Sequence, residues 1–64
     1  MLNIKKYRKR LGMTQADVAQ KLNVTKSAVS QYETGARNPD IFILKKLSDI
    51  LECTADELLE TINS

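Results

Sequence analysis

Two short amphipathic patterns, separated by only two residues, fill the stretch TQADVAQKLNVTKSAVSQYETG at residues 14–35. Ala19 stands where two helices that cross at about 90–120° would leave space for little more than a methyl group. Asn23 stands at the gap, and Asn tolerates the left-handed backbone conformation better than most residues. The apolar residues with this spacing are Val18, Leu22, Val24, Val29 and Tyr32. The pattern predicts two short helices locked at a steep angle by a tight turn.

The rest of the chain also reads as helix, because no stretch alternates apolar and polar residues long enough to make a strand. Gly12 suits the end of a first helix. Thr54 and Glu57 form a T-x-x-E capping box at the start of the last helix. Thr14 and Asp17 form a weaker version of the same box. The predicted N-caps are Asn3, Thr14, Thr25, Asp40 and Thr54. With 64 residues, the prediction is one domain over 1–64: an all-α bundle of five helices with a central helix-turn-helix.

Apolar positions in the outer helices predict the remainder of the core. The inward residues expected there are Ile4, Tyr7 and Leu11 in the first helix, Ile41, Leu44, Leu47, Ile50 and Leu51 in the fourth, and Leu58, Leu59 and Ile62 in the fifth. Phe42 and Ile43 fall outside that spacing. They either fill a shallow core or form an apolar patch that seeks a partner.

The charge is divided unevenly along the chain. Residues 1–38 hold eight basic and two acidic groups, a net charge of +6, whereas residues 39–64 hold two basic and six acidic groups, a net charge of −4. A positive half beside a negative half favours one end that meets a polyanion. Taken alone, the same division also fits charges that are merely solvated.

Metal, redox and membrane chemistry find little support in the composition. There is no histidine, and Cys53 is the only cysteine, so we expect neither a zinc site nor a disulfide, and a small buried apolar role for Cys53. No Gly-rich phosphate loop or paired acids suggest an enzyme, and no cofactor is expected. The longest apolar run, residues 41–44, is far too short to span a membrane, so a cytoplasmic location is the default.

Several segments together resemble one known family. They are TQ at 14–15, VAQKL at 18–22, AVSQYETG at 28–35, the R-N-P of residues 37–39, and the helix after Pro39. In these segments the chain resembles the helix-turn-helix proteins of the lambdoid phage repressor and Cro type and of the XRE group of bacterial regulators. The resemblance covers nearly the whole chain. It departs at Asn23, where the family usually has Gly.

The outward face of the second helix of this motif is short and polar. Ser27, Ser30, Gln31 and Thr34 form one stripe opposite Val29 and Tyr32. Such a face can approach base edges in the major groove, whereas a face rich in Glu would be repelled by phosphates. The resemblance implies base contacts by Lys26, Ser27 and Gln31, and Ser30 could contact a base or a phosphate. Both serines could equally be ordinary exposed helix residues.

The resemblance also implies contacts to the DNA backbone and one structural ion pair. The residues expected at phosphates are Gln15, Thr14, Thr25, Arg37 and Asn38. Arg8 and Glu33 are expected to form a partly buried pair that joins the first helix to the recognition helix. Lys5, Lys6, Lys9 and Arg10 would add long-range attraction, with no single contact assigned to any of them.

The function these features predict is a sequence-specific, double-stranded DNA-binding transcriptional regulator of bacterial or phage origin. It would be a repressor that binds a palindromic operator as a homodimer. The dimer interface expected comprises Phe42, Ile43, Leu58, Leu59 and Ile62. The alternative is a protein-interaction module, such as an antitoxin or a partner-sequestering regulator, that acts through the fourth and fifth helices.

Overall fold

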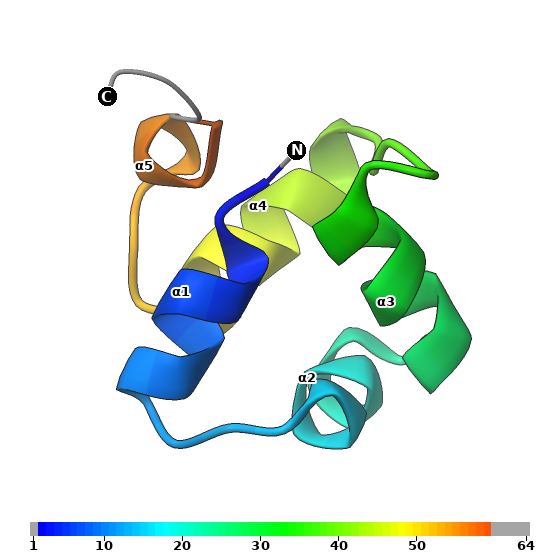
Figure 1. Cartoon of the computed structure of the whole chain (residues 1–64). Coiled ribbons are helices and arrows are strands. Elements are labelled where there is room, and N and C mark those ends of the chain that lie inside the picture. Colours follow the sequence, from blue (N-terminus) through cyan, green and yellow to red (C-terminus); the bar gives the residue numbers. More distant parts are fainter. Residues whose placement is uncertain (1, 60–64) are drawn as a thin grey trace.

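The computed structural model describes residues 2–59, which form five helices and no strand within that range. They are α1 (Ile4–Arg10), α2 (Gln15–Leu22), α3 (Lys26–Thr34), α4 (Ile41–Ile50) and α5 (Ala55–Leu59). In Figure 1, α2 and α3 are joined by a tight turn on one side of the molecule, and α5 lies on the other side, beside α1. The prediction of an all-α fold with a central helix-turn-helix is confirmed.

One hydrophobic core joins all five helices. Its fully or nearly fully buried members are Ile4, Tyr7, Val18, Ala19, Leu22, Ala28, Val29, Tyr32, Leu47, Leu51 and Leu58. Ala19 lies in α2 and Ala28 in α3, and two small side chains let these short helices approach closely. Each buried apolar side chain contributes a large share of the stability, because a small domain buries only about 60% of its unfolded surface.

Three predicted core residues, Ile41, Leu11 and Leu59, lie at the surface instead, and Leu59, the last residue of α5, is 52% exposed. Ile41 is 61% exposed because it is the first residue of α4, at the helix end, while Leu47 and Leu51 further along are fully buried. Leu11 is 38% exposed because it follows the last residue of α1, where the chain has already turned toward Gly12. Periodicity placed Ile41 and Leu11 on the inward side but did not show that each lies at the end of its own helix.

Helix caps hold most of the element boundaries. Thr14 Oγ1 accepts from Asp17 N (3.0 Å), and Asp17 Oδ2 accepts from Thr14 N (2.9 Å), which closes a reciprocal capping box. These hydrogen bonds lower the pKa of Asp17. Thr54 and Glu57 make the same exchange at α5, and the side chains of Thr25 and Asp40 cap α3 and α4 as predicted.

Asn3 does not cap α1 with its side chain, so that prediction is wrong. Its amide nitrogen Nδ2 donates to Glu57 O (3.0 Å), and its backbone N–H donates to Leu58 O (3.0 Å). Residue 3 therefore fastens the start of α1 to α5, across almost the whole length of the described chain. The short polar side chain that suits a cap serves a long-range contact here.

Asn23 forms the turn between α2 and α3 in the left-handed conformation, with φ 63° and ψ 43°. Two backbone bonds close the turn: Asn23 N donates to Gln20 O (3.2 Å), and Val24 N donates to Ala19 O (3.0 Å). The prediction for this position is confirmed. Asn makes the turn without the Gly that the family usually has there.

We expect Asn23→Ala to lower the free energy of unfolding by about 1 kcal/mol, because a β-carbon without a compensating polar side chain is disfavoured in the left-handed region. Asn23→Gly should change that free energy by less than about 0.5 kcal/mol, since Gly adopts this conformation freely. Urea denaturation followed by circular dichroism measures both. Equal losses in the two variants would show that the backbone angle at residue 23 is not what holds the turn.

Candidate nucleic-acid interface

The helix α3 presents one apolar and one polar side. Ala28, Val29 and Tyr32 are buried in the core on the side of α3 that contacts α1 and α2, which fixes the rotation of the helix about its own axis. On the opposite side lie the residues predicted to read DNA. Lys26, Ser27 and Thr34 are exposed, and Ser30 and Gln31 are half-buried. The orientation expected of α3 is therefore present, with its short polar side chains facing solvent.

The single acidic residue of α3 is turned away from that polar face. Glu33 lies against α1, where its carboxylate accepts from Arg8: Nε to Oε2 is 2.9 Å, and Nη2 to Oε1 is 3.4 Å. The two side chains are only 11% and 8% exposed. The predicted ion pair is confirmed. It also removes the one negative charge of α3 from the side that would face phosphates.

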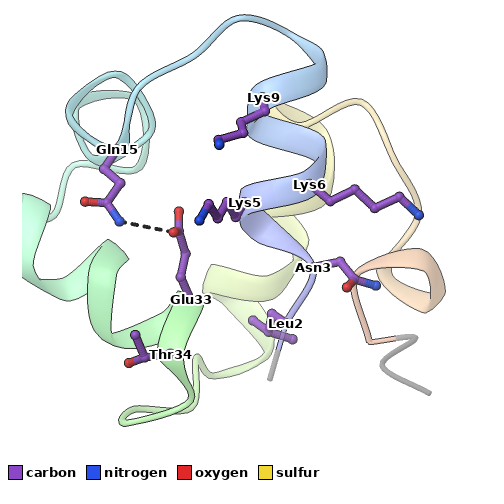
Figure 2. A pocket seen from close by; sticks show the side chains of 8 residues that line it. All are labelled: Leu2, Asn3, Lys5, Lys6, Lys9, Gln15, Glu33 and Thr34. Carbon is purple, nitrogen blue, oxygen red and sulfur yellow. Dashed lines mark hydrogen bonds between the residues drawn. The ribbon is translucent and has the colours of Figure 1, made fainter. Parts of the chain in front are cut away.

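Two more groups complete this polar cluster. Arg8 Nη1 donates to Met13 O (3.0 Å), which ties the loop between α1 and α2 to the pair. Gln15 Nε2 donates to Glu33 Oε1 (3.1 Å), as Figure 2 shows. The cluster therefore links α1, α2 and α3 at one point. The bond from Gln15 to Glu33 was not predicted, and only the position of Gln15 at the start of α2 hinted at it.

Gln15 keeps capacity for a second partner. A primary amide nitrogen carries two hydrogens, and the bond to Glu33 uses one of them. Gln15 is also the first residue of α2, where the unpaired backbone N–H groups and the helix dipole favour an anion. The bond to Glu33 therefore fixes the orientation of the Gln15 amide in the absence of any ligand.

The other predicted phosphate residues are exposed but more loosely placed. Thr14 and Thr25 use their hydroxyl oxygens as cap acceptors, and each hydroxyl hydrogen remains available to donate. Arg37 and Asn38 lie in the exposed loop after α3, which is fastened to the end of that helix by Arg37 N donating to Gln31 O (3.2 Å). Gln15, Thr14 and Thr25 are therefore fixed at the starts of α2 and α3, whereas Arg37 and Asn38 lie in the loop that follows α3.

The apolar surface differs in part from the one predicted. Phe42 is 74% and Leu59 is 52% exposed, while Ile43 is half-buried against the core. Leu58 is fully buried in the core, so its assignment to a dimer interface is wrong. Ile62 lies outside the described residues. Ile41, predicted for the core, joins Phe42 at the exposed start of α4.

No metal-binding or membrane-spanning feature is found in the part of the chain that the structure describes. Among residues 2–59 there is no cluster of three His, Cys, Asp or Glu side chains that could hold a metal ion. Cys53 is partly buried and free, and burial raises the pKa of its thiol. No helix in this range is both long enough and apolar enough to cross a bilayer.

Comparison with known proteins decides the family. The family model described as "Helix-turn-helix" matches residues 4–58. The chain belongs to the helix-turn-helix family. This confirms the resemblance to XRE-type proteins, and the recognised relatives are named as transcriptional regulators rather than enzymes.

Relatives and solved structures agree with this assignment. The chain is 43% identical over 58 residues to the uncharacterized HTH-type transcriptional regulator YqaE of Bacillus subtilis (strain 168), covering 91% of this chain and 50% of that protein. The HTH-type transcriptional regulator ImmR of the same organism is 39% identical over 56 residues, covering 88% of this chain and 44% of that protein. The chain thus spans about half the length of these relatives.

Two solved structures of SinR are similar to this chain. The N-terminal DNA-binding domain of SinR from Bacillus subtilis has a TM-score of 0.81 at 35% identity, covering 95% of this chain and 90% of that one. SinR in complex with DNA has a TM-score of 0.79 at 38% identity, covering 88% and 90%.

We expect Glu33→Gln to destabilise the domain by about 3 kcal/mol, because it keeps the shape but leaves the Arg8 guanidinium without its compensating charge. The double variant Arg8→Met/Glu33→Gln should lose less than the sum of the single losses, because the uncompensated charge is gone. Lys45→Met, which removes an exposed charge from α4, is the control and should stay within about 0.5 kcal/mol. Strictly additive losses in urea denaturation would argue that Arg8 and Glu33 act independently.

Proposed function

We propose that this chain is a sequence-specific, double-stranded DNA-binding transcriptional regulator that inserts α3 into the major groove. The observation that carries the proposal is the pair of faces on α3: one side is packed in the core, and the other offers Ser27, Gln31 and their polar neighbours at the surface. Similarity to a DNA-binding domain, and to a protein solved in complex with DNA, supports it. The side chains on this face are slim enough to reach base edges.

In this proposal the residues divide into two roles. Gln31 pairs with adenine through its amide, Lys26 reaches guanine O6 and N7, and Ser27 and Ser30 make shorter contacts near the groove floor. Phosphate contacts position the domain, and they come from Gln15, Thr14, Thr25, Arg37 and Asn38. Gln15 is the most important of them, because its bond to Glu33 links the proposed contact with a DNA phosphate to the ion pair that orients α3.

Selection of bound sequences from random duplexes tests the proposed function directly. We expect a recoverable motif, with half-sites spaced by about 34–36 Å or a multiple of that distance if two copies bind together. Recovery of no motif, with binding that depends only on duplex length, would overturn sequence-specific recognition. A matched selection with Ser27→Glu, which places a negative charge on the proposed reading face, should recover nothing.

On the selected duplex, we expect Gln31→Ala to relax discrimination at one base position by about 1–3 kcal/mol, because a bidentate contact to a base is lost. Gln15→Ala should instead weaken binding to all sequences by a similar factor, because it removes a phosphate contact. Titration against the selected duplex and against every single-base variant of it measures both. Equal losses for Gln31→Ala on specific and scrambled DNA would refute its assignment to a base.

The regulator is proposed to act as a homodimer and as a repressor in the cytoplasm. Two copies related by a two-fold axis would place two α3 helices in successive major grooves of a palindromic operator. The apolar side chains available for contact between copies are Ile41, Phe42 and the exposed edge of Ile43 on α4, and Leu59 on α5. Exposed apolar side chains of this size are a usual feature of protein interfaces.

A protein partner is the second candidate occupant of that surface, and the same exposed Phe42 favours it. We expect Phe42→Ser to reduce cooperative binding of two copies to the selected duplex while leaving the affinity for a single half-site unchanged, because residue 42 lies outside α3. Sedimentation of the protein with and without the duplex reads this out, with Lys46→Ser on the same helix as the control. One wild-type copy per palindromic duplex would rule out the dimer and leave the protein partner.

A further inference from the structure

The exposed basic residues of α1 fall on two different sides of that helix. Lys6 and Arg10 flank the ring of Tyr7, with Lys6 Nζ at 5.4 Å and Arg10 Cζ at 5.5 Å from its centroid. Lys5 and Lys9 are one turn apart on the other side, next to Arg8. Arg8 reaches α3, so Lys5 and Lys9 are the lysines that stand on the side of α1 facing the DNA-reading half of the molecule.

A groove runs between α1 and the ends of α2 and α3. Its lining includes Lys5, Lys6 and Lys9 of α1, together with Gln15, Glu33 and Thr34. In Figure 2 the side chains of Lys5 and Lys9 extend toward the hydrogen bond between Gln15 and Glu33, whereas Lys6 extends away from it. The two ammonium groups therefore share one open space with the amide of Gln15.

The positive charge of this groove is not neutralised by the carboxylate inside it. Both oxygens of Glu33 are already engaged by Arg8, and Oε1 also accepts from Gln15. Within residues 2–59 neither Lys5 nor Lys9 forms a salt bridge. Arg8 and Glu33 cancel each other, so two uncompensated positive charges remain beside an amide donor. Such a groove attracts an anion and concentrates it locally.

The groove is continuous with the proposed DNA-binding surface. Gln15, proposed to hold a phosphate, forms part of its wall, and Thr34, the last residue of α3, forms another part. A DNA strand that passes Gln15 and follows the groove would bring its neighbouring phosphates to Lys5 and Lys9. Lysine suits this role, because it meets phosphate oxygens as a flexible point charge with three donors.

We propose that the groove between α1 and the ends of α2 and α3 binds DNA phosphate beyond the one at Gln15, with Lys5 and Lys9 as its donors. This extends the DNA contact onto the first helix, outside the helix-turn-helix itself. The inference rests on the proposed DNA-binding function. It assigns separate roles to basic residues of one helix: Lys5 and Lys9 touch the backbone, while Lys6 and Arg10 do not.

The test compares two double variants of the 64-residue chain that remove the same charge from the same helix. Lys5→Gln/Lys9→Gln should make the slope of log affinity against log salt less steep by about 1.8, because each lost phosphate contact contributes about 0.9. Lys6→Gln/Arg10→Gln is the control and should change the slope by less than half of that. Titrations of the selected duplex between 50 and 200 mM salt give both slopes, and circular dichroism confirms that each variant is folded.

Duplexes with a single neutral methylphosphonate locate the contact. The Gln15→Ala variant first identifies the phosphate that Gln15 contacts. We expect a methylphosphonate at one or two neighbouring positions to weaken the binding of the wild-type protein. The same substitution should have no further effect on the affinity of Lys5→Gln/Lys9→Gln. Equal slopes for the two double variants, or unchanged sensitivity at those positions, would overturn the groove assignment while sequence-specific binding persists. Continued sequence-specific binding would show that only the groove assignment is wrong. If the proposed function itself were wrong, no duplex sequence would be selected at all. A loss confined to binding of an acidic polypeptide such as polyglutamate would also overturn it, by identifying the groove as a protein-binding surface.

Discussion

The ion pair between Arg8 and Glu33 is the interaction on which the presentation of α3 depends. Its two side chains are almost entirely shielded from water, and hydrogen bonds from Arg8 to Met13 O and from Gln15 to Glu33 complete it. Charges this shielded are costly to leave unpaired, so α1 and α3 are held in one relative position. The hydrophobic core alone would tolerate small changes in helix angle. The fixed geometry of a guanidinium against a carboxylate tolerates fewer.

The same interaction organises the electrostatics of the molecule. Glu33 is the only acid of α3, and its pairing with Arg8 leaves the outward face of that helix without negative charge. The acids of residues 39–64 lie mainly in α4, in α5 and in the loop between them. The excess positive charge of residues 1–38 therefore gathers on the side formed by α1, α2 and α3, where the proposed partner is a polyanion.

Most of the correctly predicted features of this fold are set by residues that are close together in the sequence. Thr14, Thr25, Asp40 and Thr54 cap the helices expected of them, and Asn23 adopts the left-handed angles of a tight turn. Each of these outcomes depends on residues within three or four positions along the chain. Spacing alone also predicted which sides of α2 and α3 face inward.

The failures share the opposite property, because they depend on distant parts of the chain. Asn3 bonds to α5 instead of capping α1, Ile41 is exposed at the start of α4, and Leu58 is fully buried in the core. The bond from Gln15 to Glu33 likewise joins residues far apart in sequence, on two helices. No periodic pattern records where a neighbouring helix stops. These features arise from the packing of helices that are distant in sequence, and so does the division of the α1 lysines into two groups.

The bonds of Asn3 to Glu57 O and Leu58 O have a consequence for how the domain comes apart. They join the start of α1 to α5, so loosening α5 also removes the partners of residue 3. Detaching α5 then costs these two bonds as well as the burial of Leu58, which favours unfolding of the domain as one cooperative unit. Its lifetime against proteases would accordingly follow its total stability rather than the fraying of one terminal helix.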